Sequence, residues 1–409
     1  MIFYDANVIY EAMGLAIKSS DRDRHVTQLY QVNHLLYTAM LQKAFIDGEY
    51  KPSQGHKFIL NERGKTRYVT NNCMADKTVN HIICDHILTP ALKKYLIHDN
   101  GASQKGKGVS FHRERFEKHL RDYYKEHGTN EDYILLGDFS GYYANIRHDK
   151  ISKVLAHFLR RSDIDREDLV MAWEILTGIF ETFKVDVSRF PDEDIKAMYT
   201  QKVDAMLNFG VDDDLLTGEK FLNKGVDIGN QTSQNIGVVF PYRLDNYAKI
   251  VAGIKGYGRY TDDFYAISYD RETLRKLLEA LKAIAKDFGI IINERKTRIV
   301  KLSGFYRHLQ NGYSLTETGR VIRKINPKSV TRERRKLKAY KRLLDAGRIT
   351  LDEIENIYKG WICGNYKRMS HRQIYNIHQL YLSLFRRKIK WRKHSRLRWL
   401  MEHSSPDWN

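Results

Sequence analysis

Three aspartates of this chain suggest, by their positions in the sequence, a site that binds divalent metal ions. Asp138 lies near the end of the apolar run YILLGDF at 133–139, and Asp262 and Asp263 lie between two strand-like runs, YGRYT and FYAIS. Carboxylates that are brought together repel each other strongly, and divalent cations relieve that repulsion. Two Mg²⁺ ions roughly 3.5–4 Å apart can stabilise the attacking and leaving oxygens of a phosphoryl transfer. An Asp-Asp pair in a turn is commonly just a solvated turn, so the pair alone assigns no activity.

The segments that carry these aspartates predict a small antiparallel sheet with helices packed on one face, which is an α+β arrangement. Asp262 and Asp263 fall at the tip of a hairpin. The helix after the hairpin has leucines at helical spacing, with Asp270 as its N-cap and Gly289 at its end. In chain order, the predicted elements are a strand at 133–139, the hairpin at 257–268, the helix at 270–288 and a buried strand, GIIIN, at 289–293.

Much of the remaining chain has a helical pattern. Residues 1–60 predict helices, because YQVNHLLYTAMLQKAF carries apolar residues at helical spacing. Residues 160–220 are helical and acidic, with three consecutive aspartates, and we interpret them as a solvated insertion. Pro241 predicts a kink or an early break in the helix that follows the loop at Gly225, because proline cannot continue a helix.

Positive charge is concentrated at the C-terminal end of the chain. The 409 residues carry a net charge of +19, from 69 Lys and Arg and 50 Asp and Glu, and Arg320–Asn409 holds 24 of the former against 7 of the latter. Residues 328–345 predict a basic helix, and 351–385 predict two further helices. Dense charge of one sign favours a nucleic acid partner, whereas a solvated helix face is the common alternative.

The composition excludes several classes of protein. With 42% hydrophobic and 12% aromatic residues, the chain is not disordered as a whole. We expect no membrane span, because the apolar runs are short, and no signal peptide, because MIFYDANVIYEAM lacks a basic start and a cleavage site. Cys73, Cys84 and Cys363 lie far apart without CxxC spacing, which predicts neither a disulfide framework nor a zinc knuckle and favours a reducing compartment.

Four motifs occur in an order that resembles the reverse transcriptases. They are DFSGYYANI at 138–146, IGNQTSQ at 228–234, YTDD at 260–263 and NERKT at 293–297. They resemble, in turn, the family's first palm motif, its loop-helix motif, its Tyr-x-Asp-Asp motif and its Asn-x-x-Lys-Thr motif. Any one of them is unspecific, whereas the ordered set is specific. The resemblance spans about residues 60–310 and implies a right-hand polymerase with fingers, a palm and an α-helical thumb.

The resemblance also implies a domain organisation. Residues 1–130 would form N-terminal helices and the fingers, and 131–318 would form the palm, with the helical insertion near 160–220. Residues 319–409 would form a basic helical thumb that grips the template–primer duplex, followed by an RNA-binding extension. For Trp361, Tyr375 and Tyr381 we favour a place in the thumb core over a stacking role, whereas Trp391 and Trp399 would stack on RNA.

Roles for residues of the palm follow from the same resemblance. Two Mg²⁺ ions, with Mn²⁺ as the alternative, would be held by Asp138, Phe139 through its carbonyl, Asp262 and Asp263. Lys296 would protonate the leaving pyrophosphate, and its alternative is an ordinary exposed lysine after a strand. Tyr143 would lie under the sugar and exclude a 2′-hydroxyl, and its alternative is a buried core tyrosine.

Substrate contacts are implied for the fingers and for the loop-helix motif. Lys65 and Arg67 match an element that binds the triphosphate, for which the planar arginine fork is suited. In the loop-helix motif, the residues that would face the template and the nucleotide are Ile228, Gly229, Ser233 and Gln234. Ile228 stands where retroviral and intron enzymes usually have a glutamine, and this form is similar to that of diversity-generating retroelements and related bacterial enzymes.

Together these features predict a nucleotidyltransferase that copies RNA into DNA. The resemblance extends to the bacterial reverse transcriptases of diversity-generating retroelements and of antiphage defence, and both roles stay open. The expected partners are an RNA template in the form of a structured non-coding RNA, a DNA product and dNTPs, in the bacterial cytoplasm, and the need for an accessory protein stays open. Two alternatives are a template-independent DNA polymerase of a defence system and a non-catalytic RNA-binding protein on a polymerase-like scaffold.

Overall fold

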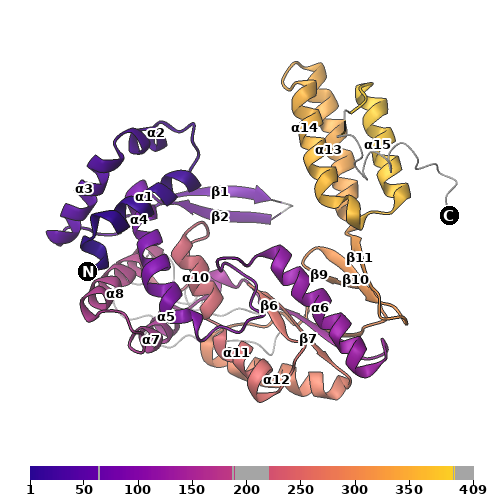
Figure 1. Ribbon diagram of the computed structural model, residues 1–409, viewed down its shortest axis with the longest axis horizontal. Coiled ribbons are helices and arrows are strands. Elements are labelled where there is room, and N and C mark those ends of the chain that lie inside the picture. Colours follow the sequence, from indigo (N-terminus) through magenta and orange to yellow (C-terminus); the bar gives the residue numbers. More distant parts are fainter. Residues whose placement is uncertain (63–64, 187, 189–220, 390, 392–409) are drawn as a thin grey trace. The chain divides into compact units, whose positions relative to one another are not determined.

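The chain is divided into two compact units (Figure 1). The computed structural model describes residues 1–62, 65–186, 188, 221–389 and 391. One unit comprises Met1–Tyr123 and Asp132–Ile299, and the other comprises Tyr124–Glu131 and Val300–Asn409. The boundaries expected for fingers, palm and thumb stay a prediction.

Three strands of a four-stranded sheet, β3, β6 and β7, lie in the first unit, and the strand order of the sheet is β6-β7-β3-β8. Its strands are β3 (Tyr133–Asp138), β6 (Gly258–Tyr260), β7 (Asp263–Ser268) and β8 (Arg298–Lys301). β7 pairs antiparallel with both β3 and β6, which confirms the predicted strand and hairpin. A Cβ at Gly137 would lie 2.1 Å from the Phe264 ring, and this close approach explains the glycine inside β3.

The helix after the hairpin, α12 (Arg271–Phe288), has the predicted caps. The carboxylate of Asp270 accepts hydrogen bonds from the backbone N–H groups of the first helical turn. Gly289 follows the last helical residue with φ of 72°, a left-handed conformation that glycine adopts without steric cost. Between these caps, the leucine-rich face of α12 is buried in the core of the unit.

The segment 289–293, GIIIN, is not a strand, and that prediction is wrong. Its isoleucines are nearly fully buried, but among the described residues it pairs through a single bridge between Ile292 and Phe139. The N–H of Asn293 donates to the carbonyl of Asp138 at 2.8 Å. The apolar run therefore reflects burial beside the end of β3, and the fourth strand of the sheet is β8.

The N-terminal part of the first unit is helical, as predicted. Its helices are α1 (Ala6–Ser19), α2 (His25–Val32) and α3 (His34–Ile46). An antiparallel hairpin follows, formed by β1 (His56–Glu62) and β2 (Lys65–Asn71). The next helix, α4 (Met74–Ile82), packs against α1.

The interpretation of 160–220 as a solvated insertion is wrong for its first helix. α8 (Arg166–Phe183) buries Ala172, Leu176 and Phe180, which join the core together with residues of α7 (His148–Leu159). The helix begins with acidic residues, but its apolar residues recur at helical spacing and form a buried face. Residues 189–220, which include the three consecutive aspartates, lie outside the described residues.

The break predicted at Pro241 is confirmed. α10 (Gln231–Val239) ends just before it, and Pro241 is the N-cap of the short α11 (Tyr242–Asn246). Since proline has no N–H to donate, it could not continue α10. The new helix brings Asp245 into the interior, where it is 1% exposed.

The second unit combines a three-stranded sheet with helices. The strand order is β11-β10-β9, with β9 (Tyr306–His308), β10 (Asn311–Leu315) and β11 (Val321–Ile325). The helices α13 (Pro327–Asp345), α14 (Leu351–Asn365) and α15 (His371–Phe385) confirm the predicted basic helix and the two after it. Leu337, Tyr358 and Tyr381 lie in a separate core, so Tyr381 is a core residue as expected. Trp399 lies outside the described residues.

None of the helices in the described ranges is both long and apolar enough to cross a bilayer.

Candidate active site

The three aspartates converge at one end of the four-stranded sheet. Asp138, the last residue of β3, lies opposite Asp263, the first residue of β7. Asp262 is the second residue of the two-residue loop of the β6–β7 hairpin and directly precedes Asp263. The carbonyl of Asp262 accepts a hydrogen bond from the N–H of Phe139 at 3.0 Å. Asp138 is buried, and the other two are half-buried. A strand end and a hairpin turn therefore bring the three predicted carboxylates together.

The turn that carries Asp262 has an unusual backbone. Thr261 has φ of 52°, a left-handed conformation that costs a β-branched residue of order 1 kcal/mol or more. A positive φ at the first residue of a two-residue loop matches the twist of the flanking strands. The Thr261 hydroxyl lies 2.8 Å from Asp262 Oδ1 and 2.7 Å from the carbonyl oxygen of Tyr260, so it can donate to either.

Lys296 forms an ion pair with Asp138. Its Nζ lies 2.8 Å from Oδ1 and 3.0 Å from Oδ2 of that carboxylate, and the lysine side chain is 54% exposed. Partial burial alone would lower the pKa of Lys296. The hydrogen bonds and charge of Asp138, together with the charges of Asp262 and Asp263, outweigh it and raise the pKa above its usual value. The protonated amine thus lies in the field of all three carboxylates.

This donor set fits a divalent cation by its chemistry. Carboxylate oxygens are the ligands that Mg²⁺ prefers, and the Lys296 ammonium already provides a positive charge at Asp138. In the described part of the chain, no three His, Cys, Asp or Glu side chains surround one point closely enough to hold an ion as they stand. Both oxygens of Asp138 bond to Lys296, so this carboxylate would exchange the lysine for the metal.

Tyr143 contacts α10 and interacts with the charge of Asp262. It is half-buried, and burial followed by the charge of Asp262 raises the pKa of Tyr143 to about 12. A Cβ at Gly237 would come within 2.7 Å of its hydroxyl oxygen, so the ring rests on the helix backbone there. The neighbouring Tyr142 is buried and donates its hydroxyl to the carbonyl of Gly237 at 2.8 Å. Sequence reasoning missed Gly237, whose signal is a glycine inside a helix.

The loop-helix motif packs on β2. The carbonyl of Ile228 accepts a hydrogen bond from the N–H of Thr70 at 2.8 Å. Gly229 has φ of 109°, and a Cβ there would lie 2.6 Å from the carbonyl oxygen of Thr70, so glycine is required. Ile228 and Gln234 are exposed. Ser233 is buried, and its hydroxyl has no hydrogen-bond partner among the described residues, so the structure does not bring it to the surface of the site.

The cations predicted for the fingers lie on β2. Arg67 is exposed and pairs across the hairpin with Leu60. The side chain of Lys65 lies outside the described residues. A third cation, Lys77 on α4, donates to the hydroxyl of Ser20 at 3.1 Å, and burial followed by the charge of Arg24 lowers the pKa of Lys77.

An open cleft of about 860 Å³ lies beside these residues in the first unit. Its walls come from α1, α2, the β1–β2 hairpin, α4 and the start of α10. Polar side chains, among them Arg24, His56, Lys77, Asn80 and Gln234, line the cleft together with a larger apolar area. A cleft of this size, with polar groups set among apolar surface, can take a ligand that has both apolar and hydrogen-bonding parts.

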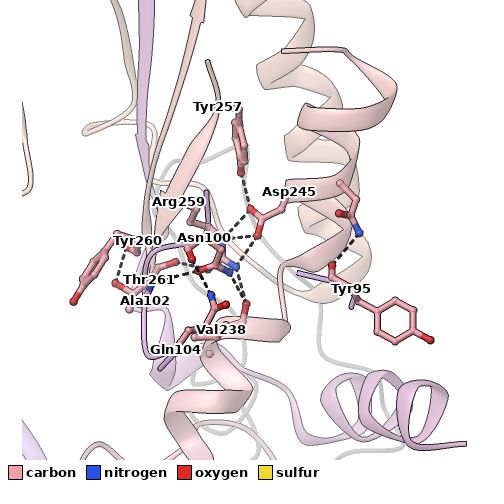
Figure 2. Close-up of polar contacts among 12 residues, drawn as sticks. Tyr95, Asn100, Ala102, Gln104, Val238, Asp245, Tyr257, Arg259, Tyr260 and Thr261 are labelled. Atoms are coloured by element: carbon pink, nitrogen blue, oxygen red, sulfur yellow. Dashed lines mark hydrogen bonds and ion pairs between the residues drawn. The ribbon is translucent and has the colours of Figure 1, made fainter. Parts of the chain in front are cut away.

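A buried polar network beside the Thr261–Asp262 turn was not predicted from the sequence (Figure 2). Arg259 on β6 and Asp245 on α11 form an ion pair, with 2.8 Å between Nη2 and Oδ2. Tyr257 donates its hydroxyl to Asp245 Oδ1, and Arg259 donates through Nη1 to the carbonyl of Thr261. Neither Arg259 nor Asp245 belongs to one of the four motifs.

Comparison with known families agrees with this arrangement. The family model described as reverse transcriptase (RNA-dependent DNA polymerase) matches residues 51–331, which is more than half of the chain. The chain therefore belongs to the reverse transcriptase family, a family of nucleotidyltransferases. Its elements are those of the right-hand polymerase fold, a mixed α+β fold with small antiparallel sheets, as predicted.

Several solved structures are similar to this chain at low identity. Telomerase from Candida albicans, in complex with a fragment of telomeric RNA, is 12% identical with a TM-score of 0.48, over 87% of this chain and 62% of that one. Apo telomerase from Candida tropicalis is 12% identical with a TM-score of 0.43, over 82% of this chain and 62% of that one. The chain thus spans less than two thirds of the length of these telomerases. No curated protein matches it.

Proposed function

We propose that this chain is an RNA-directed DNA polymerase that makes cDNA by two-metal nucleotidyl transfer. The observation that carries the proposal is the convergence of Asp138, Asp262 and Asp263 from a strand end and a hairpin turn. A scaffold without chemistry gains nothing from bringing three like charges together. Membership of the reverse transcriptase family supports the same activity.

The residues of the site divide the work of the reaction. When bound at the three aspartates and the carbonyl of Phe139, two Mg²⁺ ions, or Mn²⁺ in their place, would activate a primer 3′-hydroxyl and neutralise the pyrophosphate. Lys296, which the carboxylates keep protonated, is suited to give its proton to the leaving pyrophosphate. Tyr143 would contact the sugar of the incoming dNTP and exclude a 2′-hydroxyl.

The fingers and the loop-helix motif would bind nucleotide and template. Arg67 and Lys65 on β2 would hold the triphosphate. Ile228, Gly229 and Gln234 would face the template base and the nucleotide, with the buried Ser233 supporting them from inside α10. The cleft beside them offers a path for a single template strand.

We further propose a structured non-coding RNA as the template, in a bacterial or phage retroelement or an antiphage defence system, in the bacterial cytoplasm and with an accessory protein. The aliphatic form of the loop-helix motif, IGNQTSQ, supports this context. Sequencing of RNA and cDNA that co-purify from the native host separates the two roles. A repeated RNA encoded nearby would indicate defence, and a variable repeat with adenine-specific changes would indicate diversification.

Primer extension on a defined RNA template tests the activity. With Mg²⁺ and dNTPs we expect products that copy the template, and Asp262→Asn with Asp263→Asn should lower the rate by at least about 10³-fold, because the metal ligands are lost. Asp287→Asn, which removes an exposed carboxylate on α12, is the matched control and should leave the rate unchanged. Extension that survives the double substitution would refute the assignment. Products independent of the template, or RNA binding without synthesis, would favour one of the two alternatives instead.

A further inference from the structure

Arg259 is a fully buried cation whose guanidinium nitrogens are all hydrogen-bonded (Figure 2). Nε donates to Asp245 Oδ1 at 2.9 Å, and Nη2 donates to Asp245 Oδ2 at 2.8 Å. Nε also lies 3.0 Å from Asp245 Oδ2. Two further bonds go to backbone carbonyls, from Nη1 to Thr261 and from Nη2 to Val238, each at 2.7 Å. The planar fork therefore joins three separate segments of the first unit at one point.

The ion pair with Asp245 does not by itself account for this burial. Taking two charges out of water is costly, and replacing a buried pair by apolar residues of similar size is often neutral or stabilising. Asp245 is 1% exposed and also accepts a hydrogen bond from Tyr257 at 2.8 Å, so its carboxylate is well satisfied. This geometry holds the guanidinium in one orientation. We therefore looked for a role of Arg259 in the two backbone carbonyls to which its guanidinium donates, those of Thr261 and Val238.

One carbonyl that it holds belongs to the strained turn. Thr261, with φ of 52°, connects β6 to Asp262, and its carbonyl group forms the peptide bond to that aspartate. A hydrogen bond to this carbonyl opposes rotation of the peptide plane. The second carbonyl, that of Val238, lies one residue after Gly237, on which the Tyr143 ring rests.

The backbone of Arg259 is also tied to the neighbouring segment. Its N–H donates to the carbonyl of Asp99 at 3.1 Å, and its carbonyl accepts from Gly101 at 2.9 Å. Between them, Asn100 is fully buried and donates its side-chain amide to Val238 at 3.3 Å. Arg259, which lies on the strand that leads into the turn, is therefore held by hydrogen bonds of both its backbone and its side chain.

We propose that Arg259, oriented by Asp245, is a positioning residue that holds the Thr261 turn so that Asp262 and Asp263 face Asp138. This inference rests on the proposed polymerase activity. It assigns to a buried ion pair, remote from solvent, the task of keeping the backbone of two aspartates beside Asp138. A displacement of about 1 Å at reacting groups can cost roughly 10²-fold in rate.

Two variants of the full chain test the inference. Arg259→Lys keeps the charge but lacks the fork, since one ammonium group cannot reproduce both the Asp245 and the Thr261 contacts. Arg259→Met combined with Asp245→Leu removes both charges, so that neither is left unpaired. For both variants we expect kcat of single-nucleotide addition to fall by roughly 10–10²-fold. We also expect KM for dNTP to stay within about twofold and the Mg²⁺ concentration for half-maximal rate to rise several-fold. A merely structural role would not produce this combination.

Arg147→Lys is the matched control, because Arg147 also bonds through Nε and Nη2 to a single carboxylate, that of Asp149, but lies outside the Arg259 network. It should keep kcat and the Mg²⁺ dependence of the wild type. Folding is checked by hydrogen exchange of the amides in β3 and β7, and Asp245→Asn, which keeps the shape of the side chain, replaces any variant that fails this check. A folded variant with wild-type kcat and Mg²⁺ dependence would overturn the inference. An inactive wild-type chain would instead refute the proposed function.

Discussion

Tyr143 owes its position to a residue that has no side chain. A Cβ at Gly237 would lie 2.7 Å from the Tyr143 hydroxyl oxygen and 2.9 Å from Cζ, closer than real contacts allow. Gly237→Ala should therefore push the ring away from α10. If Tyr143 excludes the 2′-hydroxyl, we expect the preference for dGTP over GTP to fall by about 10-fold or more, which corresponds to roughly 1–3 kcal/mol. The ratio of kcat/KM for the two nucleotides measures it.

The control for this substitution is another helical glycine. Gly360 on α14 has open space where a Cβ would be added, so Gly360→Ala should stabilise its helix by about 1 kcal/mol without changing nucleotide selection. If Gly237→Ala folds and keeps the wild-type ratio for dGTP and GTP, then Tyr143 does not select the sugar.

At this scale the sequence predicts residues that belong to short motifs. Asp138, Asp262, Asp263 and Lys296 each sit in such a motif, and the structure brings all of them together. The contact of Tyr143 with Gly237 and the pair of Arg259 with Asp245 could not be predicted in this way. They join residues of different elements, and only the packing of those elements decides which residues meet.

Among the elements, the basic helix α13 contains a buried acidic residue, Glu333. Glu333 points into the core of the second unit, where it is 2% exposed and one of its oxygens has no hydrogen-bond partner among the described residues. Burial raises the pKa of Glu333, against the opposing charge of Lys336. The hydroxyl of Tyr358 is equally buried and also lacks a partner in the described part of the chain. The helix therefore buries a carboxyl group that is least costly when it is protonated.

The raised pKa gives this unit a pH-dependent stability with a definite sign. The folded state binds the proton of Glu333 more tightly than the unfolded state does. The stabilisation is complete below the unfolded-state pKa, near 4.3–4.5 for a glutamate, and is lost as pH rises through the raised folded-state pKa. Glu333→Gln removes this dependence, so at pH 8 we expect the variant to be more stable than the wild type by about 1–3 kcal/mol.

Hydrogen exchange of the amides in α13, α14 and α15 measures this stability, after correction for the intrinsic effect of pH on exchange. Glu355 is the matched control, because it is also buried but forms ion pairs with Lys359 and Arg387. Glu355→Gln should reduce protection at pH 8, where Glu333→Gln increases it. Equal protection of the wild type at pH 5 and pH 8 would contradict the role given to Glu333.

Elements whose apolar residues recur at helical spacing, with capping residues at their ends, could be predicted from the sequence. Elements whose structure depends on contacts with other segments could not. α12 and α13 have apolar residues at helical spacing, and Asp270 and Gly289 mark the ends of α12. The run GIIIN looks like a strand because it is apolar, yet strand pairing depends on a partner edge, which β8 takes instead. α8 begins with acidic residues, which suggested a solvated helix, yet its apolar face is buried in the core.

The charge of the whole molecule is unevenly distributed between the carboxylate site and the C-terminal residues. Arg320–Asn409 holds 24 Lys and Arg against 7 Asp and Glu, while the residues before it, which carry the aspartates, are nearly neutral. On α13, the exposed residues Lys328, Arg332 and Arg335 recur at i, i+4 and i+7 and so share one face. Leu337 lies on the opposite face and is buried. The helix thus presents a row of cations away from its own core.

Such a row predicts RNA binding that weakens steeply with salt. Replacing Lys328, Arg332 and Arg335 by glutamine should lower the slope of log affinity against log salt concentration by about 0.9 for each lost phosphate contact on a duplex, up to roughly 3 in total. The loss should be similar for unrelated duplex sequences, because phosphate contacts carry no sequence information. The control is a triple glutamine variant of lysines that already pair with acids, Lys301, Lys341 and Lys359, which should change the slope little. Equal slopes for the two triple variants would mean that the charge of α13 serves solubility and not nucleic acid binding.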